Sequence, residues 1–151
     1  MSGAASGQAR NLRVVLDTNV IISALCFPQS LPQRVLQTVG EHHILLFSDA
    51  LMEELETVLL RDKFDRYLSR KKRWQVLQEL NTVATYIRRT SVLTDIQDTK
   101  DNEVLAVAVD GHADYLVTGN IKHFIVDSVR AKYPNIIICT PRDFYSTILE
   151  K

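Results

Sequence analysis

The chain has 151 residues, which is the size of one compact domain. Hydrophobic residues make up 46% and charged residues 24%, a globular composition that excludes an intrinsically disordered chain. Eighteen Lys and Arg balance eighteen Asp and Glu, so the protein has no overall field that attracts nucleic acid. Any such binding must come from a local patch.

The chain termini, the apolar stretches and the cysteines predict the bounds of the domain and the compartment of the protein. We expect residues 1–11 to form a flexible tail without a secretory signal and residues 12–151 to form a single domain. The apolar stretches are far shorter than the roughly 20 residues that span a bilayer, so we expect no membrane association. Only Cys26 and Cys139 occur, which favours a reduced, cytoplasmic protein with two small buried thiols.

Short β-branched runs alternate with stretches of helical periodicity. Strands are predicted at 13–17, 44–47, 90–93, 114–118 and 135–139. Helices are predicted at 20–25, 31–39, 49–60, 74–87, 101–112 and 141–149, with Gly40 ending the second and Ser48 capping the third. Strands separated by helices indicate an α/β domain whose parallel sheet is covered on both faces.

Residues 61–73 are the one clear shift in composition, with seven basic side chains against two acidic ones. The segment is interpreted either as a solvated helical connection or as a contact surface for an RNA backbone. Tyr67 and Trp74 have rings that stack on bases in other proteins, but the helical spacing of Trp74 with Leu77 favours a place in the core.

Polar residues collect where the predicted strands end, the usual place for functional groups in an open parallel sheet. Asp17 ends the first strand, where an uncompensated carboxylate is costly. It is interpreted either as a functional acid or as the cap of the next helix, a position that Thr18 or Asn19 also suits. Asn120 follows the fourth strand.

Two further acids lie on helices. Glu54 lies on the edge of an apolar stripe, either as a boundary glutamate paired with an arginine or as a functional acid. Asp98 is a natural helix cap, and Asp101 falls in the first turn on the side that faces the sheet. We therefore expect Asp98 to be the cap and Asp101 to be the functional acid. His123 is expected only to lie in a loop near the site.

Carboxylates that gather from separate elements repel one another by roughly 4 kcal/mol at 4 Å, for an effective dielectric near 20. Such a cluster persists at neutral pH by raising a pKa or by holding a cation. Oxygen ligands without His or Cys select Mg²⁺ or Mn²⁺. Such an ion polarises a phosphodiester and supplies a hydroxide nucleophile.

Four motifs occur in a characteristic order: DTNVIISA at 17–24, the helix at 48–59, DTKDN at 98–102 and ADYLVTGN at 113–120. Over about residues 12–145 the chain resembles the PIN-domain nucleases, and within them the toxins of prokaryotic toxin–antitoxin pairs. The resemblance implies a three-layer α/β/α sandwich around a parallel sheet of about five strands. It also implies a ribonuclease that depends on Mg²⁺ or Mn²⁺.

The family's metal-ligating acids fall on Asp17, Glu54 and Asp101. Its hydroxyl and amide positions near the site fall on Thr18, Asn19 and Thr118. At the fourth acid this chain departs from the family, because Asn120 stands where many members have Asp; the amide oxygen still offers a supporting ligand. The resemblance further implies a homodimer and a small antitoxin partner.

Two other functions are compatible with the sequence. Asn120 favours a PIN-like module that binds RNA or protein with little or no turnover. A phosphatase resembling the haloacid dehalogenases would use Asp17 and Thr118, but it needs a second acid where Asn19 stands. The chain has no glycine-rich phosphate loop, which disfavours nucleotide-binding folds.

Overall fold

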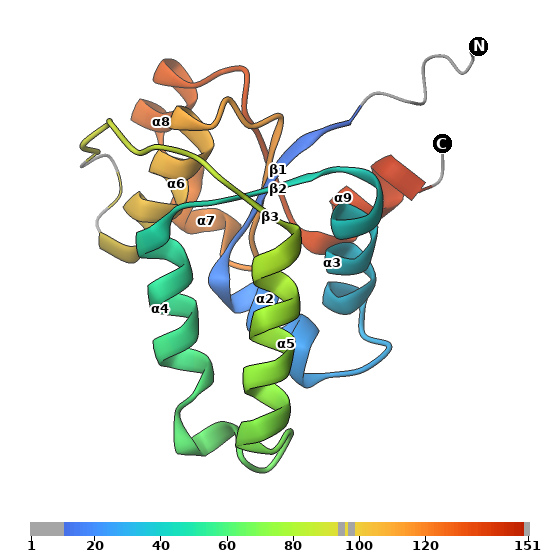
Figure 1. The fold of residues 1–151 in the computed structure, drawn as a ribbon. Coiled ribbons are helices and arrows are strands. Elements are labelled where there is room, and N and C mark those ends of the chain that lie inside the picture. The colour runs from blue at the N-terminus through green and yellow to red at the C-terminus, as the bar shows by residue number, and fades with distance from the viewer. Residues whose placement is uncertain (1–10, 94–95, 97–98, 150–151) are drawn as a thin grey trace.

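The computed structural model describes residues 11–93, 96 and 99–149. Its centre is a sheet of five short strands (Figure 1), namely β1 (Arg13–Leu16), β2 (Ile44–Phe47), β3 (Ala84–Tyr86), β4 (Tyr115–Val117) and β5 (Ile137–Cys139). All neighbours pair in parallel, in the order β3-β2-β1-β4-β5. The predicted five-stranded parallel sheet is therefore confirmed.

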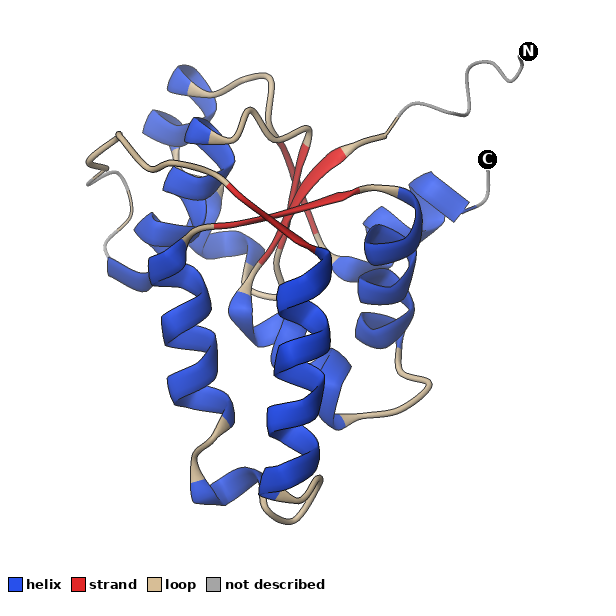
Figure 2. Cartoon of the chain, viewed as in Figure 1, coloured by secondary structure: helices blue, strands red, loops and turns tan. Residues whose placement is uncertain are grey.

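Helices connect and cover the strands (Figure 2). They are α2 (Thr18–Cys26), α3 (Leu31–His42), α4 (Asp49–Leu59), the short 3₁₀ turn η1 (Asp62–Phe64), α5 (Arg70–Val83), α6 (Thr99–Asp110), α7 (Ile121–Phe124), α8 (Asp127–Lys132) and α9 (Pro141–Leu149). Helix α6 packs against β1, β2 and β4, whereas α3 packs against β2, α2 and α9. Figure 1 shows α6 and α8 on one side of the sheet and α3 and α9 on the other, the three-layer arrangement of an α/β/α sandwich.

The central strand is buried on both faces because helices cover both sides. Val14 and Val15 are fully buried, as are Leu45 and Leu46 on β2, which explains why these strands have continuous apolar runs. The thiols of Cys26 and Cys139 are free and buried, as predicted. Burial and the nearby Asp143 carboxylate raise the pKa of Cys139 to about 12.

The third strand is where the prediction was wrong. The helical spacing of Val83 and Ile87 predicted a helix up to residue 87 and a strand at 90–93, but α5 ends at Val83 and the strand is β3. Leu45 pairs with Ala84, and the amide of Ile87 donates to the carbonyl of Phe47 at 2.8 Å. Pairing with β2 therefore decides the conformation of a segment whose side chains are mostly exposed.

Two helix details also differ from the prediction. Helix α3 continues to His42, so Gly40 lies inside it instead of ending it. On α5, Arg73 occupies the buried stripe with Leu77 and Leu80, at positions i, i+4 and i+7. Trp74 lies one position off that stripe and is 46% exposed, so the prediction that it belongs to the core was wrong.

No helix within the described part of the chain is both long and apolar enough to cross a membrane.

Candidate active site

Asp17 lies at the junction of β1 and α2, just beyond the carboxyl end of the central strand (Figure 1). Its backbone amide donates to the carbonyl of Val117 at 2.9 Å, which fixes the residue to the end of β4. It occupies the N-cap position of α2, but its side chain makes no capping hydrogen bond. The interpretation of Asp17 as a side-chain cap was therefore wrong, and its carboxylate is available for another purpose.

The carboxylate of Asp17 is held by neutral hydroxyl groups. The residue is only 3% exposed. Thr118 Oγ1 donates to Asp17 Oδ2 at 2.8 Å, and Thr18 Oγ1 lies 3.4 Å from Oδ1. No Lys, Arg or His among the described residues forms an ion pair with Asp17. A buried carboxylate without a cationic neighbour is a good ligand for a metal ion.

Thr118 connects Asp17 to the start of α7. Its side chain is fully buried at the end of β4, and its hydroxyl accepts a hydrogen bond from the amide of Asn120 at 3.0 Å. Asn120 is exposed and its side chain does not cap α7. Asn19 is also exposed, in the first turn of α2. The amide groups of Asn19 and Asn120 are thus accessible to solvent at the same end of the sheet.

Asp101 lies in the first turn of α6 and is 8% exposed, in agreement with the inward direction predicted for it. Its Oδ2 lies 3.0 Å from Nδ1 of His123 on α7. His123 was expected only to be near the site, and the fold makes it a direct partner of the predicted acid. Asp98, the predicted cap, lies outside the described residues, whereas Asn102 binds both the amide and the carbonyl of Ile96.

Glu54 lies half-buried at the middle of α4. Helix α4 packs against α2 and against α6, which carry the other two predicted acids at their amino-terminal ends. Ser48 caps α4 by accepting the amide of Leu51 at 3.1 Å, as predicted. The assignment of Glu54 as a metal ligand stays a prediction.

A polar network connects α4 with α6 beside these acids. Ser48 Oγ donates to Glu103 Oε2 at 2.9 Å, and Arg89 Nη1 lies 3.2 Å from Glu103 Oε1. Burial opposes ionisation of Asp110, but hydrogen bonds from Ser91 and Thr90, together with the Arg89 charge, hold the pKa of this carboxyl below its usual value. The network fixes the segment after β3 to α6.

The donor set suits a hard divalent ion, because its members are carboxylate, hydroxyl and amide oxygens. Across residues 11–93, 96 and 99–149, no three His, Cys, Asp or Glu side chains converge into a preformed metal cage. Mg²⁺ commonly binds through one or two carboxylates and completes its shell with water and substrate phosphate. The buried carboxylate of Asp17, which forms no ion pair with a described Lys, Arg or His, fits that mode of binding.

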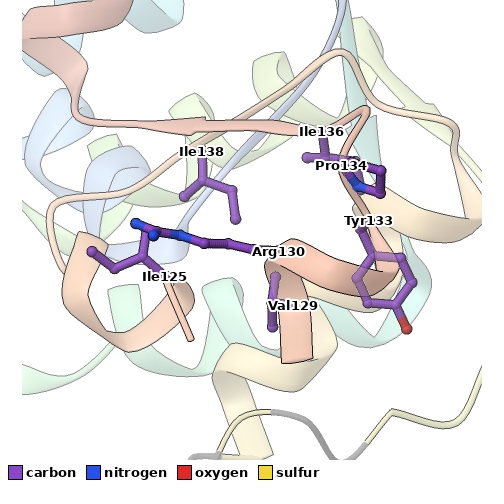
Figure 3. A pocket seen from close by; sticks show the side chains of 7 residues that line it. All are labelled: Ile125, Val129, Arg130, Tyr133, Pro134, Ile136 and Ile138. Atoms are coloured by element: carbon purple, nitrogen blue, oxygen red, sulfur yellow. The ribbon is translucent and has the colours of Figure 1, made fainter. Parts of the chain in front are cut away.

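A separate apolar pocket of about 350 Å³ lies between α8 and β5 (Figure 3). Ile125, Val129 and Ile138 line it, and the side chain of Arg130 extends across it in the figure. None of the predicted site residues lines this pocket.

The fold and these acids together define a class, the PIN domains. Residues 13–122, most of the chain, match the family model described as "PIN domain", and the protein belongs to this family. PIN domains are generally nucleases, and they generally use divalent metal ions. The predicted membership is confirmed, and a dehalogenase-like phosphatase is set aside.

The chain is also similar to a known sequence and to a solved structure. It is 27% identical over 144 residues to the uncharacterized protein MJ1680 of Methanocaldococcus jannaschii, covering 88% of this chain and 89% of the relative. The fold is similar to a chain in the crystal structure of VapBC2 from Rickettsia felis bound to a DNA fragment from their promoter. That match has a TM-score of 0.57 and 16% identity, and it covers 85% of this chain and 98% of the other.

Proposed function

We propose that this protein is a metal-dependent endoribonuclease that cleaves RNA phosphodiester bonds, with Mg²⁺ or Mn²⁺ as its ion. The observation that carries the proposal is the Asp17 carboxylate, which is buried at the carboxyl end of the central strand and whose side-chain partners among the described residues are hydroxyl groups. Membership of a family of nucleases supports the same conclusion.

In this proposal Asp17, Glu54 and Asp101 hold the ion, and Asn120 is a supporting ligand or positions water. A bound divalent ion polarises the phosphoryl group and activates water for attack. Thr118 orients the Asp17 carboxylate through its 2.8 Å hydrogen bond. His123 orients Asp101 through the contact between its Nδ1 and Asp101 Oδ2, as outer partners of metal-ligating carboxylates do. Thr18 and Asn19 lie beside Asp17 at the start of α2.

We further propose that the nuclease is the toxin of a cytoplasmic toxin–antitoxin pair and forms a homodimer. The similarity in fold to a chain of the VapBC2 structure supports this assignment, as do the motifs shared with toxins. The buried free thiols of Cys26 and Cys139 are compatible with a reducing compartment.

A second candidate is a PIN-like module that binds RNA or protein without efficient turnover. Two observations favour it: Asn120 removes one negative charge from the predicted site, and the described residues do not form a preassembled cage. The two candidates differ in whether a divalent ion binds at Asp17. Binding of Mn²⁺ is therefore measured alongside cleavage.

The test is cleavage of a 5′-labelled single-stranded RNA by the wild-type protein and by Asp17→Asn. The amide has nearly the same shape, so the fold is expected to persist while the charge that holds the ion is lost. We expect internal cleavage with Mg²⁺ or Mn²⁺, loss of cleavage with EDTA, and at least a hundredfold slower cleavage by the variant.

The matched controls are Asp127→Asn, an exposed acid at the start of α8, and Glu53→Gln, the exposed neighbour of Glu54. Both should retain full activity, whereas Glu54→Gln should lose it. Full activity of Asp17→Asn would refute the proposed site. Absence of cleavage together with absence of an Mn²⁺-induced rise in melting temperature would favour the binding module.

A further inference from the structure

The segment between α4 and α5 forms a tip that combines cations with aromatic rings. It lies at the end of the α4–α5 hairpin farthest from the sheet (Figure 1). Of its seven basic residues, Arg70 lies 3.7 Å from Asp62, and Arg73 pairs with Asp65. The other five are exposed and form no ion pair with a carboxylate in the part of the chain that the structure describes: Arg61, Lys63, Arg66, Lys71 and Lys72. On a chain of zero net charge, this is a strong local concentration of positive charge.

Aromatic rings lie among these cations. Tyr67 is 43% exposed, and Phe27, which follows α2, packs edge-to-face on it with the ring centroids 4.9 Å apart. The guanidinium of Arg66 lies 5.6 Å from the centre of the Tyr67 ring, and Lys63 lies 5.2 Å from that of Phe64. Trp74 is exposed in the first turns of α5. Exposed rings among cations are the combination that binds single-stranded nucleic acid, by stacking on bases and neutralising phosphates.

The tip is rigid, because a fully buried guanidinium holds it together. Arg73 Nη1 donates at 2.9 Å to the carbonyls of both Leu59 and Arg61, and its Nη2 binds the carboxylate of Asp65. A simple connection between two helices does not need a buried cation at its centre. The arrangement presents Tyr67 and its neighbouring cations in a fixed position, which lowers the entropy lost on binding.

Three of the basic residues of the tip lie at the amino-terminal end of α5, where positive charge destabilises a helix. The first turn of α5 carries Arg70, Lys71 and Lys72 and no acid. The amino-terminal end of a helix has a partial positive charge, so cations there are unfavourable. Arg70 has Asp62 as a partner within the chain, but the presence of Lys71 and Lys72 is explained if they interact with an anion outside it.

The position of the tip relative to Asp17 fits a substrate strand. Helix α2 begins directly after Asp17 and ends directly before Phe27. Its nine residues span about 14 Å at 1.5 Å per residue. Known sites for single strands cover roughly 4–16 nucleotides, so one strand spans both places.

We infer that the tip, comprising residues 61–74 and Phe27, binds single-stranded RNA next to the site of cleavage. This inference rests on the proposed function, because it names where the substrate of the nuclease is held. The five exposed cations other than Arg70 contact phosphates, and Tyr67 and Trp74 stack on bases.

The experiment measures binding, so it does not depend on turnover. A fluorescein-labelled single-stranded RNA of 12 nucleotides is titrated in EDTA with the wild-type protein and with two double variants, and anisotropy is followed at several salt concentrations. The tip variant is Lys63→Gln/Arg66→Gln. The matched control is Arg130→Gln/Arg142→Gln, which removes two exposed cations from α8 and α9, away from the tip (Figure 1).

We expect the tip variant to bind about tenfold or more weakly at 0.1 M salt. The slope of log K against log salt should become shallower by about 1.4, because each phosphate contact to a single strand contributes about 0.7. Tyr67→Ala should weaken binding about tenfold and leave that slope unchanged, since stacking releases no counterion. The control variant should bind as the wild type does.

The melting temperature of the tip variant should fall by no more than a few degrees, because both side chains are exposed and each loses only an exposed cation–π contact, worth about 0.5–1 kcal/mol. Equal RNA affinities for the tip and control variants would overturn the inference. A change in oligomeric state without a change in RNA affinity would also overturn it and identify the tip as a protein interface. Binding at the tip without cleavage in Mg²⁺ or Mn²⁺ would support this inference while contradicting the proposed nuclease activity.

Discussion

Thr118→Val removes the buried hydroxyl that forms the shorter of the two hydrogen bonds to the Asp17 carboxylate, with little change in shape. Thr118 Oγ1 donates to Asp17 Oδ2 at 2.8 Å and accepts from the amide of Asn120 at 3.0 Å. A hydrogen bond to a charged group contributes about 1.5–3 kcal/mol, and water does not replace it where Asp17 is 3% exposed. Asn120 is exposed, so water satisfies its amide at little cost. We expect a loss of about 2 kcal/mol in the free energy of unfolding.

The same variant tests the metal site. For a chain of 151 residues, 2 kcal/mol lowers the melting temperature by about 4–8 °C. Loss of a partner that orients a ligand typically weakens metal affinity by 10–100-fold. The stabilisation by Mn²⁺ should therefore shrink by about 1.3–2.3 kcal/mol at a concentration near 100 times the wild-type Kd. Both quantities come from thermal unfolding followed with and without Mn²⁺.

The control for this prediction is Thr57→Val. Thr57 is exposed on α4, and among the described residues its hydroxyl bonds only to the carbonyl of Glu53 in its own helix. This variant should stay within about 0.5 kcal/mol of the wild type and keep its Mn²⁺ response. If Thr118→Val were as stable as the wild type and bound Mn²⁺ equally well, Thr118 would not position Asp17 and the reasoning would fail.

Two further predictions concern stability. Arg73→Met removes the guanidinium donor from the carbonyl of Leu59, leaves the carbonyl of Arg61 with only the amide of Phe64 as a donor among the described residues, and removes the partner of Asp65, so urea unfolding should show a loss of about 2–4 kcal/mol. Arg70→Met breaks an exposed ion pair with Asp62 and an exposed hydrogen bond to the carbonyl of Leu60, which water replaces, so it should cost less than about 1 kcal/mol. Equal losses would contradict the structural importance of the buried guanidinium. The native pKa of Asp110 is lowered, so the carboxyl contributes stability above its ordinary pKa of 3.8, and this contribution is lost as the pH falls through the lower native value. Asp110→Asn should therefore be less stable than the wild type at pH 7, and the difference should shrink in acid; a difference independent of pH would contradict the prediction.

Local patterns in the sequence determined most of the elements. The apolar runs of β1 and β2 and the serine cap of α4 follow from side-chain chemistry within a few residues, and the structure confirms them. The inward direction of Asp101 followed in the same way, from helical periodicity alone. Such features need no knowledge of distant contacts, because they depend on short-range hydrogen bonding and on burial of one face.

The fold decided what local patterns could not. The side chains of β3 are mostly exposed, so only its hydrogen bonds to β2 distinguish it from a continued helix. Arg73 looked like one more surface cation and Trp74 like a core residue, but the carbonyls at the end of α4 provided partners for a buried guanidinium.

At the predicted site, the sequence by itself determined which acidic side chains lie at the end of a strand or the start of a helix. Burying a carboxylate at such a position costs free energy in any fold unless it has a partner, so these acids are recognisable without the structure. Only the tertiary structure decided the partners. Thr118 reaches Asp17 from 101 residues away, and His123 reaches Asp101 from a different helix. Parallel pairing of β1 with β4 creates the first contact, and packing of α6 against α7 creates the second, so neither is encoded in a local pattern.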